Sequence, residues 1–279
     1  MAGGVFDTLQ AWFPLLFNFD LLARYGGRLM DGLGMTLQVV GIACSLGFVL
    51  AYPICRGRMS GNPLLRGAAL CYVTYFRGTP LLCQLYLVYY GAGEIRPLLT
   101  SLGLWVFFRQ AFFCCIFAFT LNTAAYQAEI FRGALASVAK GQSEAATALG
   151  LSKFRVARHV VWPQAFLVAL RPLGNELVSM IKASSLAAIV TLLDLMGQTR
   201  FIFARSFDFS VYLYAAIIYL AMTETIRRLW RRMEIAGTKH LAISQPATAP
   251  KQPARRFVPG VVAPGTINEG PVAGLRPPF

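Results

Sequence analysis

Polar and charged residues interrupt several otherwise apolar stretches of this 279-residue chain. An ionisable side chain within an apolar span is costly, so it usually faces the protein interior or a water-filled path. The residues found here offer a guanidinium, amides, a phenol and carboxylates, which are groups that bind a polar solute. The candidate pathway residues are Arg77, Gly78, Thr79, Asn122, Tyr126, Glu129, Asn175 and Glu176.

Three of these residues are spaced for one helical face. Asn122 and Tyr126 are four residues apart and Glu129 follows three later, so their side chains line one stripe of a helix. Glu129 is near the end of its span and has Arg132 three residues on, so a local ion pair is the alternative for it. Asn122 and Tyr126 lie deeper and are the better pathway candidates.

The run Arg77-Gly78-Thr79-Pro80 predicts a broken helix inside a span. Gly78 loosens the helix, Thr79 can cap it and Pro80 can restart it. A helix that restarts within the membrane presents free N–H groups, which suit a substrate carboxylate. The alternative is a simple kink, with Arg77 reaching the membrane boundary or paired inside a complex.

Asn175, Glu176 and Lys182 are further polar groups in an apolar segment. Two interpretations remain open for the charged pair. Glu176 and Lys182 either pair across subunits or line the solute path.

No catalytic or metal-binding pattern accompanies these residues. The sequence lacks G-x-x-x-x-G-K-[ST], G-x-S-x-G and H-E-x-x-H, and His159 and His240 have no evident ligand partners. The six cysteines form no C-x-x-C pair and read as small apolar packing residues. We expect no catalytic site, no metal and no cofactor bound by this chain.

Residues 141–163 form the longest polar stretch between hydrophobic spans. Ser143 is predicted to cap a helix with Glu144 in its first turn, where an acid suits the positive helix end. Gly150 is predicted to stop this helix. The helix then has one small, flat face that could lie in a groove of another protein, made by Ala145, Ala146 and Leu149. The alternative is a surface helix with no partner.

A second short helix is expected after this turn. Ser152 can cap it, and Pro163 opens the next segment at a position where its missing N–H costs nothing.

Composition places these segments in a membrane protein. The chain is 56% hydrophobic and 14% charged, whereas a soluble domain has about a quarter charged residues. Apolar runs of about 20 residues cross roughly 30 Å of hydrocarbon. We predict an all-α polytopic protein with about five spans, near residues 29–54, 67–91, 110–131, 164–193 (with a short re-entrant piece) and 209–229. Within 164–193, breaks are expected at Arg171-Pro172 and at Lys182–Ser185.

The predicted organisation has three parts: an interfacial segment 1–28, a membrane domain 29–235 containing the 141–163 loop, and a proline-rich tail 236–279 that we expect to be disordered. A docking role for the tail is the alternative.

The net charge of +14 is explained by topology and not by nucleic acid, because the cations cluster at span ends and in the tail. Twelve Lys and Arg residues flank the spans on the side of the 141–163 loop, against six on the other. The bias predicts an outside N-terminus, and a cytoplasmic loop and C-terminus.

The 141–163 segment resembles the loop that defines permease subunits of bacterial ATP-binding-cassette importers. That loop contains Glu-Ala-Ala, three residues, Gly, nine residues, then an aliphatic residue, any residue, an apolar residue and Pro. The matching residues here are Glu144-Ala145-Ala146, Gly150, Val160 and Trp162-Pro163. Val160 and Trp162 replace the commoner Ile and Leu.

Two more runs resemble polar amino acid permeases: Phe76-Arg77-Gly78-Thr79-Pro80, and residues 119–133, which are similar to the histidine and basic amino acid branch. The resemblance implies a type I importer transmembrane domain in the bacterial inner membrane. It also implies a coupling helix docked on a cytoplasmic ATPase dimer that holds ATP and Mg, a second homologous or identical permease, and a periplasmic amino-acid-binding protein. Polar amino acids, basic or opine-type, are the implied substrates.

An ion-coupled carrier or channel without an ATPase has the same hydropathy and is the alternative from a different class. Co-purification with an ATPase discriminates between the two. A membrane enzyme lacks support, since no catalytic constellation occurs in the chain.

Overall fold

A computed structural model describes residues 18–242, with side chains as far as residue 237. Within this range every regular element is a helix. The long helices are α2 (Phe19–Arg58), α3 (Pro63–Gly78), α8 (Ala111–Ser137), α11 (Trp162–Ala183) and α13 (Ser210–Ala242). The shorter ones are α4 (Leu81–Tyr89), α5 (Gly91–Glu94), α6 (Arg96–Ser101), α7 (Trp105–Phe108), α9 (Lys140–Ala148), α10 (Lys153–Val156), the π-helix η1 (Ala157–Val161), the 3-10 helix η2 (Ser184–Val190) and α12 (Leu195–Ser206).

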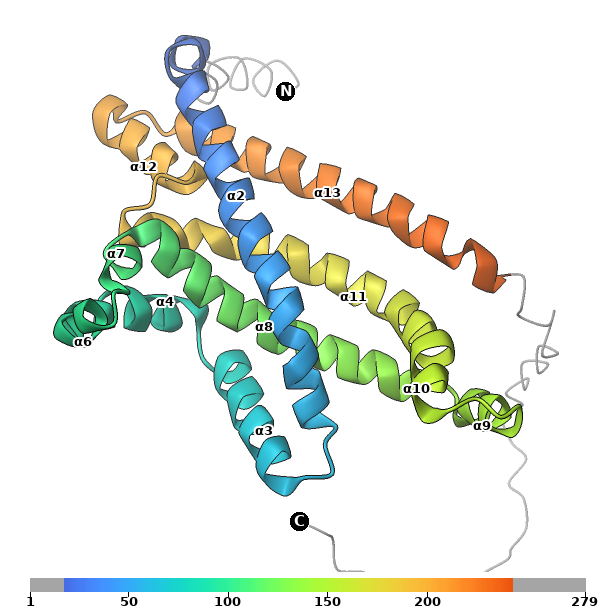
Figure 1. Cartoon of the computed structure of the whole chain (residues 1–279). Coiled ribbons are helices and arrows are strands. Elements are labelled where there is room, and N and C mark those ends of the chain that lie inside the picture. The colour runs from blue at the N-terminus through green and yellow to red at the C-terminus, as the bar shows by residue number, and fades with distance from the viewer. Residues whose placement is uncertain (1–17, 243–279) are drawn as a thin grey trace, which may run out of the picture. The chain divides into compact units, whose positions relative to one another are not determined.

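Helix α8 is the centre of the packing. It contacts both α2 and α11, and α2 crosses it along much of its length (Figure 1). Small residues allow this approach: a Cβ atom added at Gly47 of α2 would lie 2.4 Å from Cγ2 of Thr123 and 3.3 Å from the backbone N of Ala124. Such a close approach is typical of helices packed in membranes.

The predicted all-α membrane architecture is confirmed. Three segments of the described chain are long and apolar enough to span a bilayer, Phe19–Arg58, Ala111–Ser137 and Lys153–Val190. The predicted span 67–91 is divided between α3 and α4, and the predicted span 209–229 lies within α13.

One predicted helix break is wrong. Arg171 and Pro172 lie inside the continuous helix α11. Ala165, Ala169 and Leu173 are buried on one face of α11 and belong to a core cluster with residues of α2 and α8. We attribute the persistence of the helix to this packing, which continues on both sides of the proline. The second predicted break is confirmed, because α11 ends at Ala183 and a 3-10 helix follows.

Helix α12 was not predicted. The Asp194 side chain caps it by accepting a hydrogen bond from the Gly197 amide at 2.9 Å, and the Leu195 amide donates to Oγ1 of Thr36 in α2 at 3.1 Å. These bonds fix the start of α12 against α2. In the sequence, the polar run at residues 197–200 made this segment look like a loop.

The termini differ from the predicted boundaries. Asn18 caps α2, so residues 19–28 belong to the same helix as the first span. Helix α13 continues to Ala242, beyond the boundary predicted at residue 235. The described residues as far as Lys239 belong to one compact unit. The predicted segments 1–17 and 243–279 lie outside the described residues.

The packing at Gly47 gives a direct test. We expect Gly47→Ala to lower the unfolding free energy by about 1–3 kcal/mol, because its methyl group meets the buried Thr123. Gly34→Ala in the same helix is the control, since nothing lies within 4 Å of its added Cβ, and loss of a helical glycine stabilises by up to about 1 kcal/mol. Thermal unfolding of the purified protein in detergent measures both. Equal melting temperatures for the two variants would contradict this packing.

Candidate functional site

The predicted break between α3 and α4 is confirmed. Helix α3 ends at Gly78, and both Thr79 and Pro80 have extended backbone angles before α4 begins at Leu81. Pro80 causes the break, because it disfavours the helical conformation for the residue before it. The Thr79 hydroxyl donates to the carbonyl of Tyr75 at 2.8 Å, so it covers the end of α3. Gly78 is exposed and has open space around it.

A buried glutamine, Gln84 of α4, bridges this break. Its side-chain Nε2 donates to the carbonyls of Phe76 and Thr79 at 2.9 and 3.1 Å and to the Thr79 hydroxyl at 2.8 Å. Only 2% of Gln84 is exposed. The sequence reasoning did not identify Gln84. Its signal was an amide side chain in an apolar run four residues after Pro80.

Asn122 of α8 completes the same hydrogen-bond network. Its Nδ2 donates to Oε1 of Gln84 at 2.9 Å and to the carbonyl of Phe76 at 3.1 Å. Asn122 is buried, and its amide donor is therefore occupied by the chain itself. The predicted pathway residue Asn122 holds the broken helix against α8 and does not present its N–H groups to a solute.

Arg77 and Tyr126 lie together at the edge of this network. The Arg77 guanidinium carbon is 5.3 Å from the centre of the Tyr126 ring, which is a cation–π distance. Arg77 is exposed and Tyr126 is half-buried. Arg77 forms no ion pair with the described residues. Its charge is thus oriented by an aromatic ring and remains open to an anionic group.

Glu176 of α11 also contacts α8. Oε1 of Glu176 accepts a hydrogen bond from the Thr123 hydroxyl at 3.0 Å, and Thr123 in turn accepts one from Gln127 at 3.0 Å. The carboxylate is half-buried and forms no salt bridge within the described chain. Arg77 of α3 and Glu176 of α11 thus each contact α8, at Tyr126 and at Thr123 respectively.

Two predicted pathway residues lie elsewhere. Asn175 is exposed and lines a hollow of about 450 Å³ between α11 and α13, together with Arg171, Glu224 and Arg228. Glu129 forms salt bridges with Arg58 at 2.8 Å and Arg132 at 2.7 Å, so both of its oxygens are occupied. The local ion pair considered for Glu129 is thus present, and α2 contributes a second cation.

The polar loop starts earlier than predicted. Helix α9 begins at Lys140 with Ala139 at the cap position, and the Ser143 hydroxyl donates to the Lys140 carbonyl at 2.8 Å. Ser143 is therefore inside the helix and is not its cap. Ala139 has an extended backbone, which places the helix start one turn before the serine. Glu144 follows in the second turn, and its side chain is exposed.

The predicted stop at Gly150 is confirmed. Gly150 has φ +79°, which favours glycine because a Cβ atom is strained there. The Leu151 amide donates to the Ala146 carbonyl at 3.2 Å and the Gly150 amide to the Thr147 carbonyl at 2.9 Å. This pair of bonds is a Schellman motif, which ends a helix and reverses the chain.

The expected small face of α9 is divided. Ala145 and Leu149 are exposed, Leu149 to 83%, whereas Ala146 is buried against its own chain with 6% exposed. Ala146 therefore supports the helix and does not face a partner. Beyond the turn, Ser152 is at the cap position of α10 but makes no capping bond. Phe154, 72% exposed, adds an apolar group that the sequence reasoning did not include.

A family model and individual relatives place this chain in the same group of proteins. Residues 43–232 match the model of the family described as "Binding-protein-dependent transport system inner membrane component". The nopaline transport system permease protein NocM of Agrobacterium fabrum is 39% identical over 84% of this chain and 98% of the relative. The histidine/lysine/arginine/ornithine transport system permease protein HisM of Escherichia coli K12 is 34% identical over 83% of this chain and 95% of the relative.

Solved structures agree with the fold. A crystal structure described as an amino acid ABC transporter with histidines has a TM-score of 0.70 and 32% identity, covering 79% of this chain and 99% of that one. An inward-facing structure of the MetNI methionine ABC transporter has a TM-score of 0.64 at 19% identity over 77% of this chain and 99% of that one, and it supports the fold alone. The chain belongs to the family of inner membrane components of binding-protein-dependent transport systems.

Proposed function

We propose that this chain forms the translocation path for polar amino acids, of basic or opine type, in an ATP-driven importer. The observation that carries this proposal is the placement of Arg77 on Tyr126 at 5.3 Å, with Glu176 bound to Thr123 of the same helix at 3.0 Å. A basic amino acid carries a carboxylate that Arg77 can bind and a cationic side chain that Glu176 can bind. The relatives whose names specify nopaline, octopine and basic amino acids support this substrate class.

The chain itself is a permease subunit and not an enzyme, as its family membership and its relatives indicate. Membership in this family also argues against the alternative function, an ion-coupled carrier without an ATPase. In our proposal two cytoplasmic ATPases hold ATP and Mg, a second permease completes the path, and a periplasmic protein delivers the substrate.

The proposed docking surface for the ATPase is the exposed side of α9 with the turn that follows it. Ala145 and Leu149 share one side of the helix, and Glu144 adds a charge beside them. The Schellman turn at Gly150 fixes where Leu149 and Phe154 stand relative to each other. Closure of the ATPases would move α9 and, through α8, the helices around Arg77 and Glu176.

The proposed orientation has the N-terminus outside and the loop 141–163 and the C-terminus in the cytoplasm. The excess of Lys and Arg beside the loop ends supports it. Arg56 at the end of α2 lines one cavity with Thr147 of α9. Arg58 of α2 and Arg132 of α8 share the carboxylate of Glu129.

The coupling role is tested at Gly150. Gly150→Val places a β-branched residue at φ +79° and costs about 1–2 kcal/mol locally, so α9 should lengthen or tilt while the spans stay folded. We expect weaker ATPase retention in a pull-down and loss of substrate-stimulated hydrolysis in proteoliposomes of the whole complex. Gly141→Val in the same helix is the control, because Gly141 has ordinary backbone angles and open space. If both variants couple like the wild type, this loop is not the coupling element.

The substrate proposal is tested at Glu176. We expect Glu176→Gln to lower uptake of arginine relative to glutamine about ten-fold, which corresponds to the loss of about 1.4 kcal/mol from one charge interaction. Asn175→Ala is the control, since Asn175 faces α13. Uptake by proteoliposomes with the complete transporter measures the ratio. An unchanged arginine-to-glutamine ratio in Glu176→Gln would contradict the assignment, whatever the total rate.

A further inference from the structure

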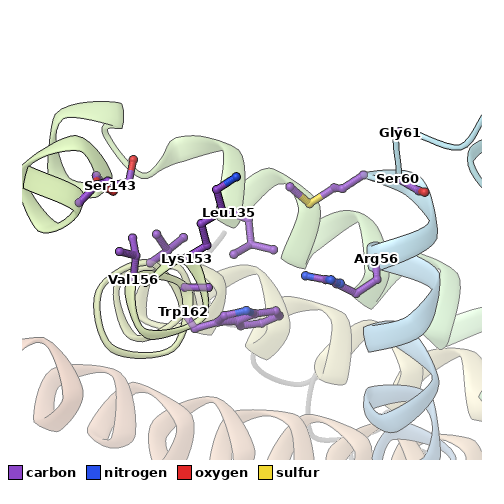
Figure 2. Close-up of a pocket in the computed structure, with 12 residues that line it drawn as sticks. Arg56, Ser60, Gly61, Leu135, Ser143, Lys153, Val156 and Trp162 are labelled. Atoms are coloured by element: carbon purple, nitrogen blue, oxygen red, sulfur yellow. The ribbon is translucent and has the colours of Figure 1, made fainter. Parts of the chain in front are cut away.

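A cavity of about 660 Å³ opens beside the coupling elements, apart from the Arg77–Glu176 region (Figure 2). Its walls come from the end of α2, the end of α8 and the start of the segment Lys153–Val190. These are the neighbouring ends of all three segments that qualify as membrane spans. Lipid headgroups lie where spans leave the bilayer, so a headgroup can reach a cavity between the ends of spans.

Two cations enter this cavity from different elements. Arg56 extends from α2 toward the loop, and Lys153 enters from α10 on the other side (Figure 2). Neither forms an ion pair with the described residues. The carboxylate of Glu129 cannot neutralise them, because Arg58 and Arg132 already occupy it. The cavity thus has two positive charges without a counter-charge from the described residues.

Apolar groups form most of the rest of the wall, and Ser60, Ser143 and Thr147 are its polar members. The indole of Trp162 stacks near Tyr52 with ring centres 5.5 Å apart, and Leu135 and Val156 lie beside it. Tryptophan and tyrosine are typical of the boundary between bilayer and water. From Gly61, at the rim, the chain continues into α3, whose first leucines Leu64 and Leu65 are 81% and 57% exposed.

We propose that this cavity binds the phosphate headgroup of an anionic phospholipid. Two uncompensated cations select an anionic phosphate, and basic pockets at span ends are suited to such lipids. The apolar wall and the exposed leucines suit the glycerol and acyl parts, which a soluble phosphate lacks. This inference does not depend on the identity of the transported substrate.

A phosphate bound in this cavity would also affect the 141–163 loop. Thr147 of α9 and Lys153 of α10 line the cavity together with Arg56 of α2. A bound phosphate would connect the proposed ATPase-docking helix to the first span, so anionic lipid would hold α9 in place.

The test uses the whole transporter complex, stripped of lipid and titrated with phosphatidylglycerol, with bound lipid counted by native mass spectrometry. We expect R56Q/K153Q to weaken the strongest phosphatidylglycerol site about thirty-fold, at roughly five-fold for each basic group. The control is R66Q/R155Q, which removes the same net charge from exposed residues of α3 and α10 outside the cavity lining. Wild type and control should bind alike, and phosphatidylcholine should not compete.

Three results would overturn the proposal. The first is wild-type phosphatidylglycerol binding by R56Q/K153Q. The second is displacement of the lipid by equimolar glycerol phosphate, which would assign the site to a soluble phosphate. The third is carbodiimide cross-linking of Lys153 to the ATPase in the lipid-saturated complex, which would assign the cations to a protein contact.

Discussion

A broken helix inside a bilayer must satisfy the backbone groups that the break leaves free, because no water is available there. In this protein Gln84 donates to the carbonyls of Phe76 and Thr79, and Asn122 donates to the carbonyl of Phe76 and to Oε1 of Gln84. An unsatisfied buried group costs about 1–3 kcal/mol, so the two amides make the break tolerable. Arg77 lies in the last turn of α3, just before this break, and its position on Tyr126 follows from how α3 and α4 are held against α8.

Helix α8 joins the two proposed sites. Along one part it carries Asn122, Thr123 and Tyr126, which contact the broken helix and Glu176. Toward its other end Glu129 binds Arg58 of α2, and α8 then leads into α9. The ion-paired end fixes α2 and α8 to each other, so a force applied at α9 would act on both helices. This connection is a physical route by which ATP hydrolysis could change access to the Arg77 region.

The sequence predicted the local backbone structure correctly where a single residue type determines the backbone conformation. Pro80 predicted the break and Gly150 predicted the helix stop, and the structure has both. Ser143 and Pro172 show the opposite case. Helix α9 begins one turn before Ser143, because Ala139 has the extended backbone of a cap residue. Helix α11 continues through Pro172, and Ala165, Ala169 and Leu173 of this helix pack in the core on both sides of the proline.

The partners of polar residues could not be predicted, because they come from distant segments. Asn122 and Tyr126 share a stripe, yet Asn122 is bound to Gln84 while Tyr126 meets Arg77. Glu176 and Asn175 are adjacent in sequence but face different helices, α8 and α13. Which of two neighbouring polar residues faces a path depends on the rotation of the helix, and tertiary packing sets that rotation.

The most direct test of the account is the accessibility of Leu149, which is 83% exposed in the isolated chain. In a background lacking the exposed Cys71 and Cys83, Leu149→Cys would be treated with a membrane-impermeant maleimide, with Ile95→Cys as the outside control. We expect labelling of Ile95→Cys but not of Leu149→Cys in intact cells. In inside-out vesicles, Leu149→Cys should react only after the ATPase is removed. Labelling of Leu149→Cys in intact cells, or equal labelling with and without the ATPase, would contradict the account.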